Sequence, residues 1–330
     1  MNYLKAKKYF QQALEKSNHN AYIHIGNLYL SGYGFTKDYK KARDYFKLAS
    51  DEQDSNGYLN LAEMYVGNFD FAKDYLLAKD YYEKAAELKN SYAYLRLGDL
   101  YFFGNYFPKN YEQAIKYYES AAALENSIAY IYLGFIYKDG IGTKKDIKKA
   151  INYLELAAYL KNPDAHLLLG YLYSEDNSEF DLEKAIDYFK IAAEKNNPGA
   201  LYFMGYFHST GEISGIDIEK AIYYYEKCAN IEKTGPLYGY PSFCMTVYSY
   251  RNNNHRYLAY NNLGLIYLTD LNDNEKAQEN LEKAAFGDLT LAQNNLGLFM
   301  QLYGNEEQYL KAEYYFKKSA KKRFALAEFN

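Results

Sequence analysis

Tryptophan is absent from the 330 residues, and only two cysteines and five prolines occur. Two cysteines are too few for a disulfide framework or a cysteine-based zinc site, and the five histidines show no metal-ligand spacing. No apolar run approaches the ~18 residues of a membrane helix, and no signal peptide opens the chain. We therefore expect a cytoplasmic protein without a cofactor, metal or membrane partner. A secreted or periplasmic protein with its signal removed would have the same sequence.

Neither sign of charge dominates the sequence. Lys and Arg number 38 against 42 Asp and Glu, which gives a net charge of -4. Proteins that bind nucleic acid usually present a strongly basic face, so we expect no nucleic-acid partner. Hydrophobic residues make up 49% of the chain, which is typical of a folded protein with a buried core.

Two small residues recur through the chain at almost the same period. The first, the A marker, is held by Gly26, Ala62, Gly98, Gly134, Gly170, Gly205, Gly264 and Gly297. The second, the B marker, is held by Ala6, Ala42, Ala78, Ala114, Ala150, Ala185, Ala221, Ala277 and Ala312. The spacing is close to 36 residues throughout, and both series are interrupted at the same place. Such self-similarity is the signature of a repeat protein.

Both segments of the repeat show the periodicity of a helix. In the second segment Ala42, Tyr45, Phe46 and Ala49 stand at i, i+3, i+4 and i+7, which places them on one apolar face. The tyrosines three residues after the B marker are expected in the core: Tyr9, Tyr45, Tyr81, Tyr117, Tyr153 and Tyr188. An Asp or Asn stands four residues before most B markers and is expected to cap the helix: Asp38, Asp74, Asn110, Asp146, Asp181 and Asp217.

The predicted fold is all-α, because no segment alternates with a period of two. We expect a right-handed superhelical α-solenoid in which repeats of about 36 residues each form an A helix and a B helix. Residues 1–330 are predicted to form one solenoid domain of about eight to nine helix pairs. The interruption predicts an insertion at residues 230–256, which is either a structured surface loop or an element that contacts a partner.

The sequence resembles the Sel-one-like repeats, which are relatives of the tetratricopeptide repeat. Their A segment, A-x-x-x-L-G-x-x-Y-x-x-G-x-G, is similar to residues 129–142, and their B segment, D-x-x-K-A-x-x-Y-Y-x-K-A-A, is similar to residues 217–227. The glycine that usually follows the B helix is replaced here, as at Lys89-Asn90. The resemblance implies a scaffold or adaptor for protein assembly, often in bacteria.

Catalytic chemistry has no support in the sequence. Cys228 occupies a position that Ala holds in other repeats, so we interpret it as a small core residue, and no base stands near it. The glycine pairs around Gly32 and Gly140 lack the strand that precedes a phosphate loop, so we interpret them as turns. We expect no enzyme activity and no small-molecule substrate.

A partner protein is expected to bind the A helices, at positions that the repeat does not fix. Two such positions, two residues before the A marker and one residue after it, share a helix face. The predicted partner-binding residues are His24, Asn27, Asn60, Glu63, Arg96, Asp99, Tyr132, Phe135, Leu168, Tyr171, Phe203 and Tyr206. The last two repeats continue the series with Asn262, Leu265, Asn295 and Leu298. Side chains in the middle repeats are apolar, so they either anchor the partner or pack beneath the superhelix without meeting solvent.

Two functions fit this architecture. The first is a scaffold or adaptor that holds a peptide or helix of a partner protein in a concave groove. The second is an immunity or neutralising protein that wraps one dedicated toxin or effector. The identity of the partner and the oligomeric state do not follow from the sequence.

Overall fold

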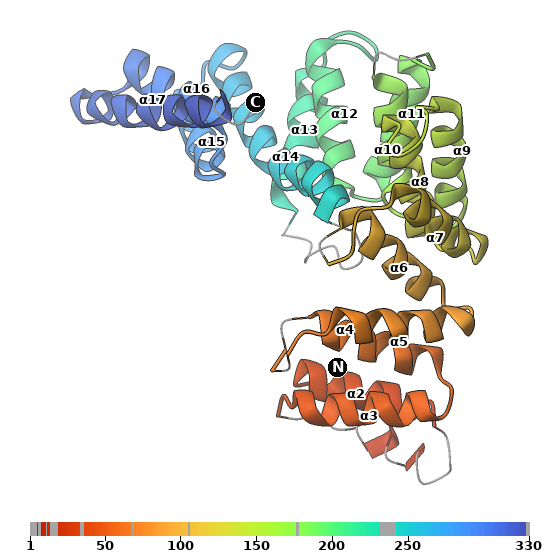
Figure 1. Ribbon diagram of the computed structural model, residues 1–330. Helices are drawn as coiled ribbons and strands as arrows, with labels where there is room; N and C mark the ends of the chain where they lie inside the picture. The colour runs from red at the N-terminus through yellow and green to blue at the C-terminus, as the bar shows by residue number, and fades with distance from the viewer. Residues whose placement is uncertain are drawn as a thin grey trace. The chain divides into compact units, whose positions relative to one another are not determined.

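The computed structural model describes residues 5, 8–10, 12–13, 19–33, 36–67, 69–70, 72–104, 106–175, 178–231 and 242–327 (Figure 1). For residues 242–254 and 322–327 only the helical backbone is described. Within these ranges the secondary structure is helical, with sixteen helices and no strand. The helices form two compact units, unit 1 (Met1–Leu156) and unit 2 (Ala157–Asn330). The prediction of one solenoid domain over residues 1–330 stays a prediction.

The helices succeed one another in A–B pairs. Unit 1 contains α2 (Ala21–Ser31), α3 (Tyr39–Asp51), α4 (Ser55–Val66), α5 (Tyr75–Glu87), α6 (Ser91–Phe103), α7 (Tyr111–Ala123) and α8 (Ser127–Asp139). Helix α9 (Ile147–Tyr159) begins in unit 1 and ends in unit 2. Unit 2 continues with α10 (Ala165–Ser174), α11 (Leu182–Glu194), α12 (Pro198–Thr210), α13 (Ile218–Asn230), α14 (Ser242–Thr269), α15 (Asn274–Phe286), α16 (Thr290–Tyr303) and α17 (Glu306–Ala327).

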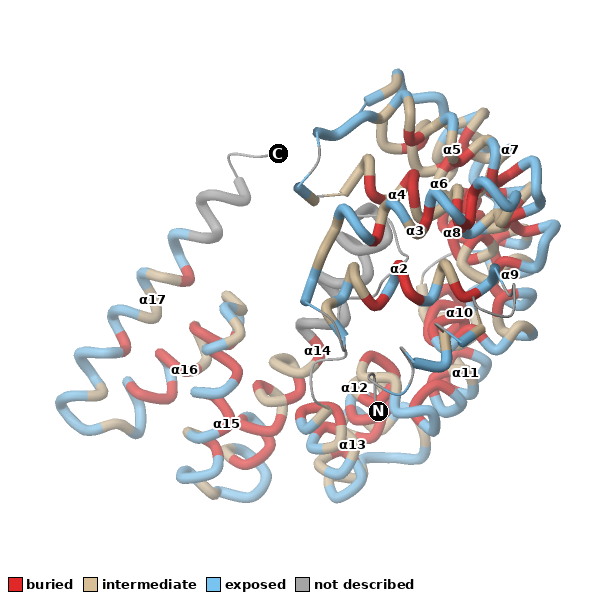
Figure 2. Tube along the Cα trace, turned by 90° about the horizontal axis from the view of Figure 1, so that it is seen from below, coloured by how far each residue is buried: buried red, intermediate tan, exposed pale blue. Residues whose placement is uncertain are grey.

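Within each unit, successive helices pack against one another. Unit 1 shows this from α2 to α8, and unit 2 from α10 to α17, where α12 also contacts α14 and α14 contacts α16. Figure 2 shows buried residues recurring along these helices. An array of packed helix pairs is therefore confirmed for the described residues.

The A marker is small because an aromatic ring of the B helix lies against it. A Cβ added at Gly170 would lie 2.7 Å from Cε1 of Phe189, and one added at Gly98 would overlap the Tyr118 ring. Both rings are fully buried and stand four residues after the B marker. The close approach of the A and B helices thus depends on a ring that stands one position beyond the tyrosines that we expected in the core.

Those expected tyrosines lie at the edge of the core instead. Tyr9 is mostly exposed, and the others are half-buried. Five of them stack on a tyrosine of the preceding A helix, with ring centroids 5.6 to 5.9 Å apart. The pairs are Tyr29–Tyr45, Tyr65–Tyr81, Tyr101–Tyr117, Tyr137–Tyr153 and Tyr173–Tyr188. Each pair joins the two helices of one repeat at their surface.

The predicted helix caps are confirmed. The side chain of each capping residue accepts a hydrogen bond, 2.9 to 3.0 Å long, from the backbone N–H three residues later. This contact satisfies one of the N–H groups that lack a partner in the first turn. The residues are Asp38, Asp74, Asn110, Asp146, Asp181 and Asp217.

In five of the turns that follow B helices, the usual glycine is replaced by a residue with a positive φ and a capping residue. Lys89 has a φ of 58°, and Gln53, Glu125, Lys161 and Asn196 have similar values. Two of the capping asparagines also link neighbouring repeats. The Nδ2 of Asn90 donates to Ser55 Oγ at 3.1 Å, and that of Asn126 donates to Ser91 Oγ at 3.2 Å.

The predicted insertion at residues 230–256 ends inside a helix. Residues 232–241 lie outside the described part of the chain. From residue 242 onward the backbone forms α14, which continues without a break through Gly264 to Thr269. The second half of the insertion therefore extends the A helix of the following repeat. No helix of the described residues combines the length and apolar character needed to span a membrane.

Candidate protein-binding surface

The predicted binding residues of unit 1 differ widely in exposure. His24 and Asn27 on α2 are exposed, whereas Asn60 and Glu63 on α4 are half-buried. On α8, Tyr132 and Phe135 are at most 8% exposed. The edge of the Tyr132 ring packs on Tyr118, with ring centroids 5.2 Å apart. Both side chains are therefore part of the packed core, so they do not offer the open apolar surface that an anchor for a partner needs.

A charged network joins the A helices α4 and α6. The Nε of Arg96 donates to Glu63 Oε1 at 2.7 Å, and a terminal guanidinium nitrogen of Arg96 donates to Asp99 Oδ2 at 3.1 Å. Two buried tyrosines complete the network from the B helices. The hydroxyl of Tyr82 donates to Glu63 Oε1, and that of Tyr118 donates to Asp99 Oδ1, both at 3.0 Å. The polar residues of the A helices thus serve the packing of unit 1.

Burial changes the protonation of this network. Burial raises the pKa of the Asp99 carboxyl to about 6, because it outweighs the opposing effects of Arg96 and the hydrogen bond from Tyr118. Burial disfavours the charged form of Arg96, but the carboxylates of Glu63 and Asp99 outweigh it and raise the pKa of Arg96. The pKa of Tyr82 is raised, first by burial and then by the Glu63 charge. The network therefore couples the packing of unit 1 to pH.

The predicted apolar anchors of unit 2 pack mostly on one another. Leu168 on α10 is buried and offers no open surface to a partner. Tyr171 and Phe203 are half-buried, and the Phe203 ring lies 4.8 Å from Phe189 and 5.1 Å from Tyr171. Nε2 of His255 lies 3.1 Å from the Tyr171 hydroxyl. Because His255 belongs to the predicted insertion, a segment of the chain itself packs on these aromatic residues.

A different set of apolar side chains is exposed on the A helices of unit 2. Tyr206, Leu265 and Leu298 occupy the position one residue after the A marker, on α12, α14 and α16, and α14 packs against both of the others. Helix α16 adds Leu291 and Leu302, which share a helical face with Leu298. All five are between 36% and 71% exposed. We call these five residues the leucine surface.

Asparagines two residues before the A marker lie beside this surface. Nδ2 of Asn262 donates to the Tyr225 hydroxyl, and Nδ2 of Asn295 donates to Asn261 Oδ1, both at 2.9 Å. These contacts hold α14 to α13 and α16 to α14. The sequence predicted Tyr206 as a binding residue and placed Leu265 and Leu298 in the same series, but it missed Leu291 and Leu302. Leu302 had a partial signal, because the same position is polar in most other repeats, as at Ser31, Asp139, Glu175 and Thr210, although α6 has Phe103 there.

Two kinds of reactive group bear on catalysis among the described side chains, metal-binding clusters and cysteine. No three His, Cys, Asp or Glu side chains among them lie close enough together to hold a metal ion. Burial raises the pKa of the Cys228 thiol to about 12, and its Sγ donates to the Pro198 carbonyl at 3.2 Å. A thiol in this state is a poor nucleophile at neutral pH.

Comparison with protein families gives nine matches to the Sel1 repeat. They cover residues 2–18, 19–54, 55–90, 91–126, 127–162, 163–197, 198–230, 258–285 and 290–323. The matches leave residues 231–257 uncovered, close to the predicted insertion. A search of curated proteins returned no match.

Solved structures with the same fold include two of similar architecture. A Sel1 repeat protein from Oxalobacter formigenes is 29% identical, with a TM-score of 0.62, over 70% of this chain and 95% of that one. The protective antigen c5321 of uropathogenic Escherichia coli, which displays an SLR fold, is 24% identical with a TM-score of 0.58, over 96% and 71% of the two chains. The immunity protein Pa5087 from Pseudomonas aeruginosa is 18% identical over 71% and 84%, and its TM-score of 0.38 carries no functional argument.

Proposed function

Because the chain belongs to the Sel1 repeat family, whose members generally mediate protein–protein interaction and are typically non-enzymatic, we propose that it is a scaffold that binds a partner protein through the leucine surface. The partner supplies an apolar peptide or helix. The observation that carries this proposal is the exposure of Tyr206, Leu265 and Leu298 at one repeat position on three successive A helices.

The energetics favour a partner at this place. Fully burying a Leu or aromatic side chain contributes about 2 kcal/mol, so these partly exposed side chains contribute about 1 kcal/mol each when covered. Scattered apolar residues are ordinary on protein surfaces, whereas a contiguous apolar patch marks an interaction site. Unit 1 presents exposed polar residues instead, such as His24 and Asn27, which fit polar contacts with the same class of partner.

Capture of proteins from the organism's own lysate tests the proposal. A variant combining Tyr206→Ser, Leu265→Ser and Leu298→Ser is expected to lose the proteins that the wild type retains. The control combines Leu76→Ser, Leu156→Ser and Tyr223→Ser, which change more exposed residues of the same types on B helices and should leave capture intact. Circular dichroism confirms that both variants keep their helical content. Retention of the same proteins by all three forms would refute the proposal.

The same experiment separates the scaffold from the neutralising protein. A neutralising protein predicts one stoichiometric partner that resists high salt, because a dedicated complex is tight. A scaffold predicts several weaker partners of one process. Substituting Phe135 or Tyr171 instead is less informative, because these side chains are packed against the protein and their loss would also affect stability.

A further inference from the structure

One position of the B helix holds a tyrosine in three successive repeats of unit 1. Tyr39, Tyr75 and Tyr111 stand three residues before the B marker, and each meets the A–B loop of the next repeat. Tyr39 packs edge-on against Phe69, with centroids 5.1 Å apart, and Tyr75 stacks on Tyr106. A Cβ added at Gly142 would overlap Tyr111. An aromatic ring is thus the usual filling between a B helix and the next loop.

In unit 2 the same place is not filled by a ring. Leu182 on α11 occupies the position of Tyr75, and Ile213 in the next loop occupies the position of Tyr106, eight residues after the A marker. A cavity of about 400 Å³ remains there, which is within the range of pockets that bind small ligands. Replacement of two stacked rings by two short aliphatic side chains accounts for the space.

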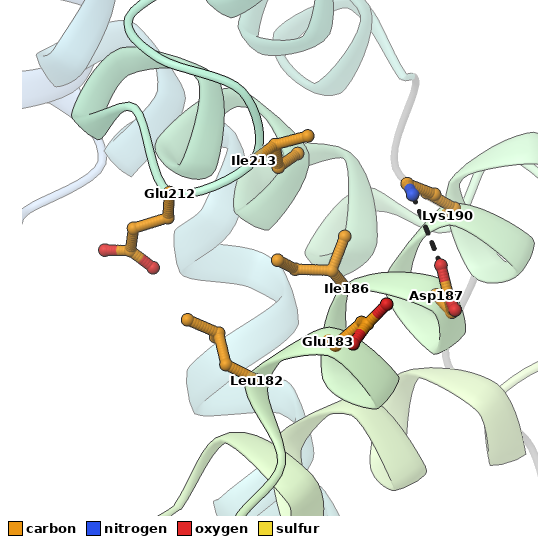
Figure 3. A pocket seen from close by; sticks show the side chains of 7 residues that line it. All are labelled: Leu182, Glu183, Ile186, Asp187, Lys190, Glu212 and Ile213. Atoms are coloured by element: carbon orange, nitrogen blue, oxygen red, sulfur yellow. Dashed lines mark hydrogen bonds and ion pairs between the residues drawn. The ribbon is translucent and has the colours of Figure 1, made fainter.

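The lining of this cavity combines an apolar floor with an acidic rim. Figure 3 shows Leu182 and Ile186 of α11 on one side and Glu212 and Ile213 of the loop on the other. The remaining lining residues are Glu183, Asp187 and Lys190, and Lys190 Nζ lies 3.2 Å from Asp187 Oδ1. Three carboxylates against one ammonium leave the rim negative. Such a rim favours a hydrogen-bond donor and disfavours an anion.

We propose that this cavity binds the phenol side chain of a tyrosine supplied by a partner protein. The ring takes the place that Tyr75 fills in unit 1, and the apolar floor covers its face. The positive edge of an aromatic ring suits the carboxylate rim, and the hydroxyl donates to Glu183 or Glu212. This site is separate from the leucine surface, so it stands or falls independently of the function proposed above.

Methyl NMR of the full chain titrated with p-cresol, the side chain of tyrosine as a free molecule, tests the site. We expect saturable shifts of the Leu182, Ile186 and Ile213 methyls. Leu182→Tyr adds to the chain the ring that the cavity lacks, so it should weaken binding about tenfold or more. Ile218→Tyr is the matched control, because Ile218 holds the same position in the next repeat and does not line the cavity. It should bind p-cresol like the wild type.

Three results would overturn the proposal. The first is the absence of shifts at these methyls up to the solubility of p-cresol. The second is equal binding of p-cresol by Leu182→Tyr and by the wild type, provided that Leu182→Tyr and Ile218→Tyr both unfold at the wild-type temperature. The third is stronger binding of n-butylammonium, the lysine side chain, than of p-cresol, which would assign the acidic rim to a basic partner residue. To keep the test valid if Leu182→Tyr misfolds, Ile213→Tyr closes the cavity from the loop and should also abolish binding.

Discussion

The position one residue after the A marker has opposite character in helices α4 and α6 of unit 1 and in helix α14 of unit 2. In unit 1 it holds Glu63 and Asp99, whose carboxylates accept hydrogen bonds from Tyr82 and Tyr118. In unit 2 it holds Leu265, and the ring position of the next B helix is Leu281, which has no hydroxyl to satisfy. A residue that varies between repeats can therefore be a polar packing contact in one repeat and an exposed apolar residue in another. The side chain at the ring position of the following B helix determines which of the two roles the residue has.

Removing the central cation of the unit 1 network should have the largest effect on this comparison. We expect Arg96→Met to lower the free energy of unfolding by about 3 kcal/mol, because it leaves two partly buried carboxylates side by side. Lys116→Met is the control, since its pair with Glu112 is solvent-exposed and should contribute almost nothing. Urea denaturation measures both. Equal losses would show that the network is no more than a surface ion pair.

The pH dependence of unit 1 follows from the raised pKa of Asp99. A folded-state pKa of about 6, above the ordinary 3.8, means that its contribution to stability is present below pH 3.8 and is lost as pH rises through 6. Between pH 4 and pH 7 the wild type should lose about 2 kcal/mol relative to Asp99→Asn. Unfolding free energies of both proteins at the two pH values measure this difference. A constant difference would mean that Asp99 titrates normally.

Exchanging tyrosine and phenylalanine at the ring position of the B helix tests whether the residue after the A marker determines the type of ring. Tyr118→Phe should cost about 1–2 kcal/mol, because Asp99 loses a hydrogen-bond donor. Phe189→Tyr should cost a similar amount, since the new hydroxyl enters a fully buried site beside aromatic rings instead of a carboxylate. Thermal unfolding of both variants gives the measurement. If Phe189→Tyr were neutral, the residue after the A marker would not determine the ring.

The leucine surface should contribute least to stability. Leu265→Ser and Leu298→Ser are each expected to lower the free energy of unfolding by only about 1 kcal/mol, because each side chain is already partly buried on folding. Denaturation of the double variant, beside the capture experiment described above, checks this. A loss of several kcal/mol would place both leucines in the core and remove them from the binding surface.

The fold could be predicted from the sequence because its determinants are local and periodic. The A and B markers, the apolar face around Ala42 and the caps such as Asp38 all act within one repeat, so the period of 36 residues exposes them. The contact of Phe46 with Gly26 could almost have been predicted as well. The period alone, however, does not say whether Tyr45 or Phe46 contacts the glycine.

The binding surface could be predicted only in part, because exposure depends on what packs over a helix face. Spacing placed Tyr171 and Phe203 on the predicted face, and the structure places His255 beside both of them. His255 is 84 residues away from Tyr171 and belongs to a segment without a repeat partner. Contacts of this kind leave no periodic signal. Glu63, Arg96 and Asp99 were found by spacing, but their mutual hydrogen bonds were not.

The asparagine–serine hydrogen bonds between repeats determine which lengths of insertion or deletion the array can accept. Asn90 and Ser55 are 35 residues apart, as are Asn126 and Ser91. Deletion of residues 56–91, which number 36, would bring Ser55 to the place of Ser91 and leave it 35 residues before Asn126. The bond is therefore restored after the loss, or the duplication, of whole repeats, whereas a change by a fraction of a repeat breaks it. Recombination between these repeats can thus lengthen or shorten the array while the junctions that carry the bond stay in register.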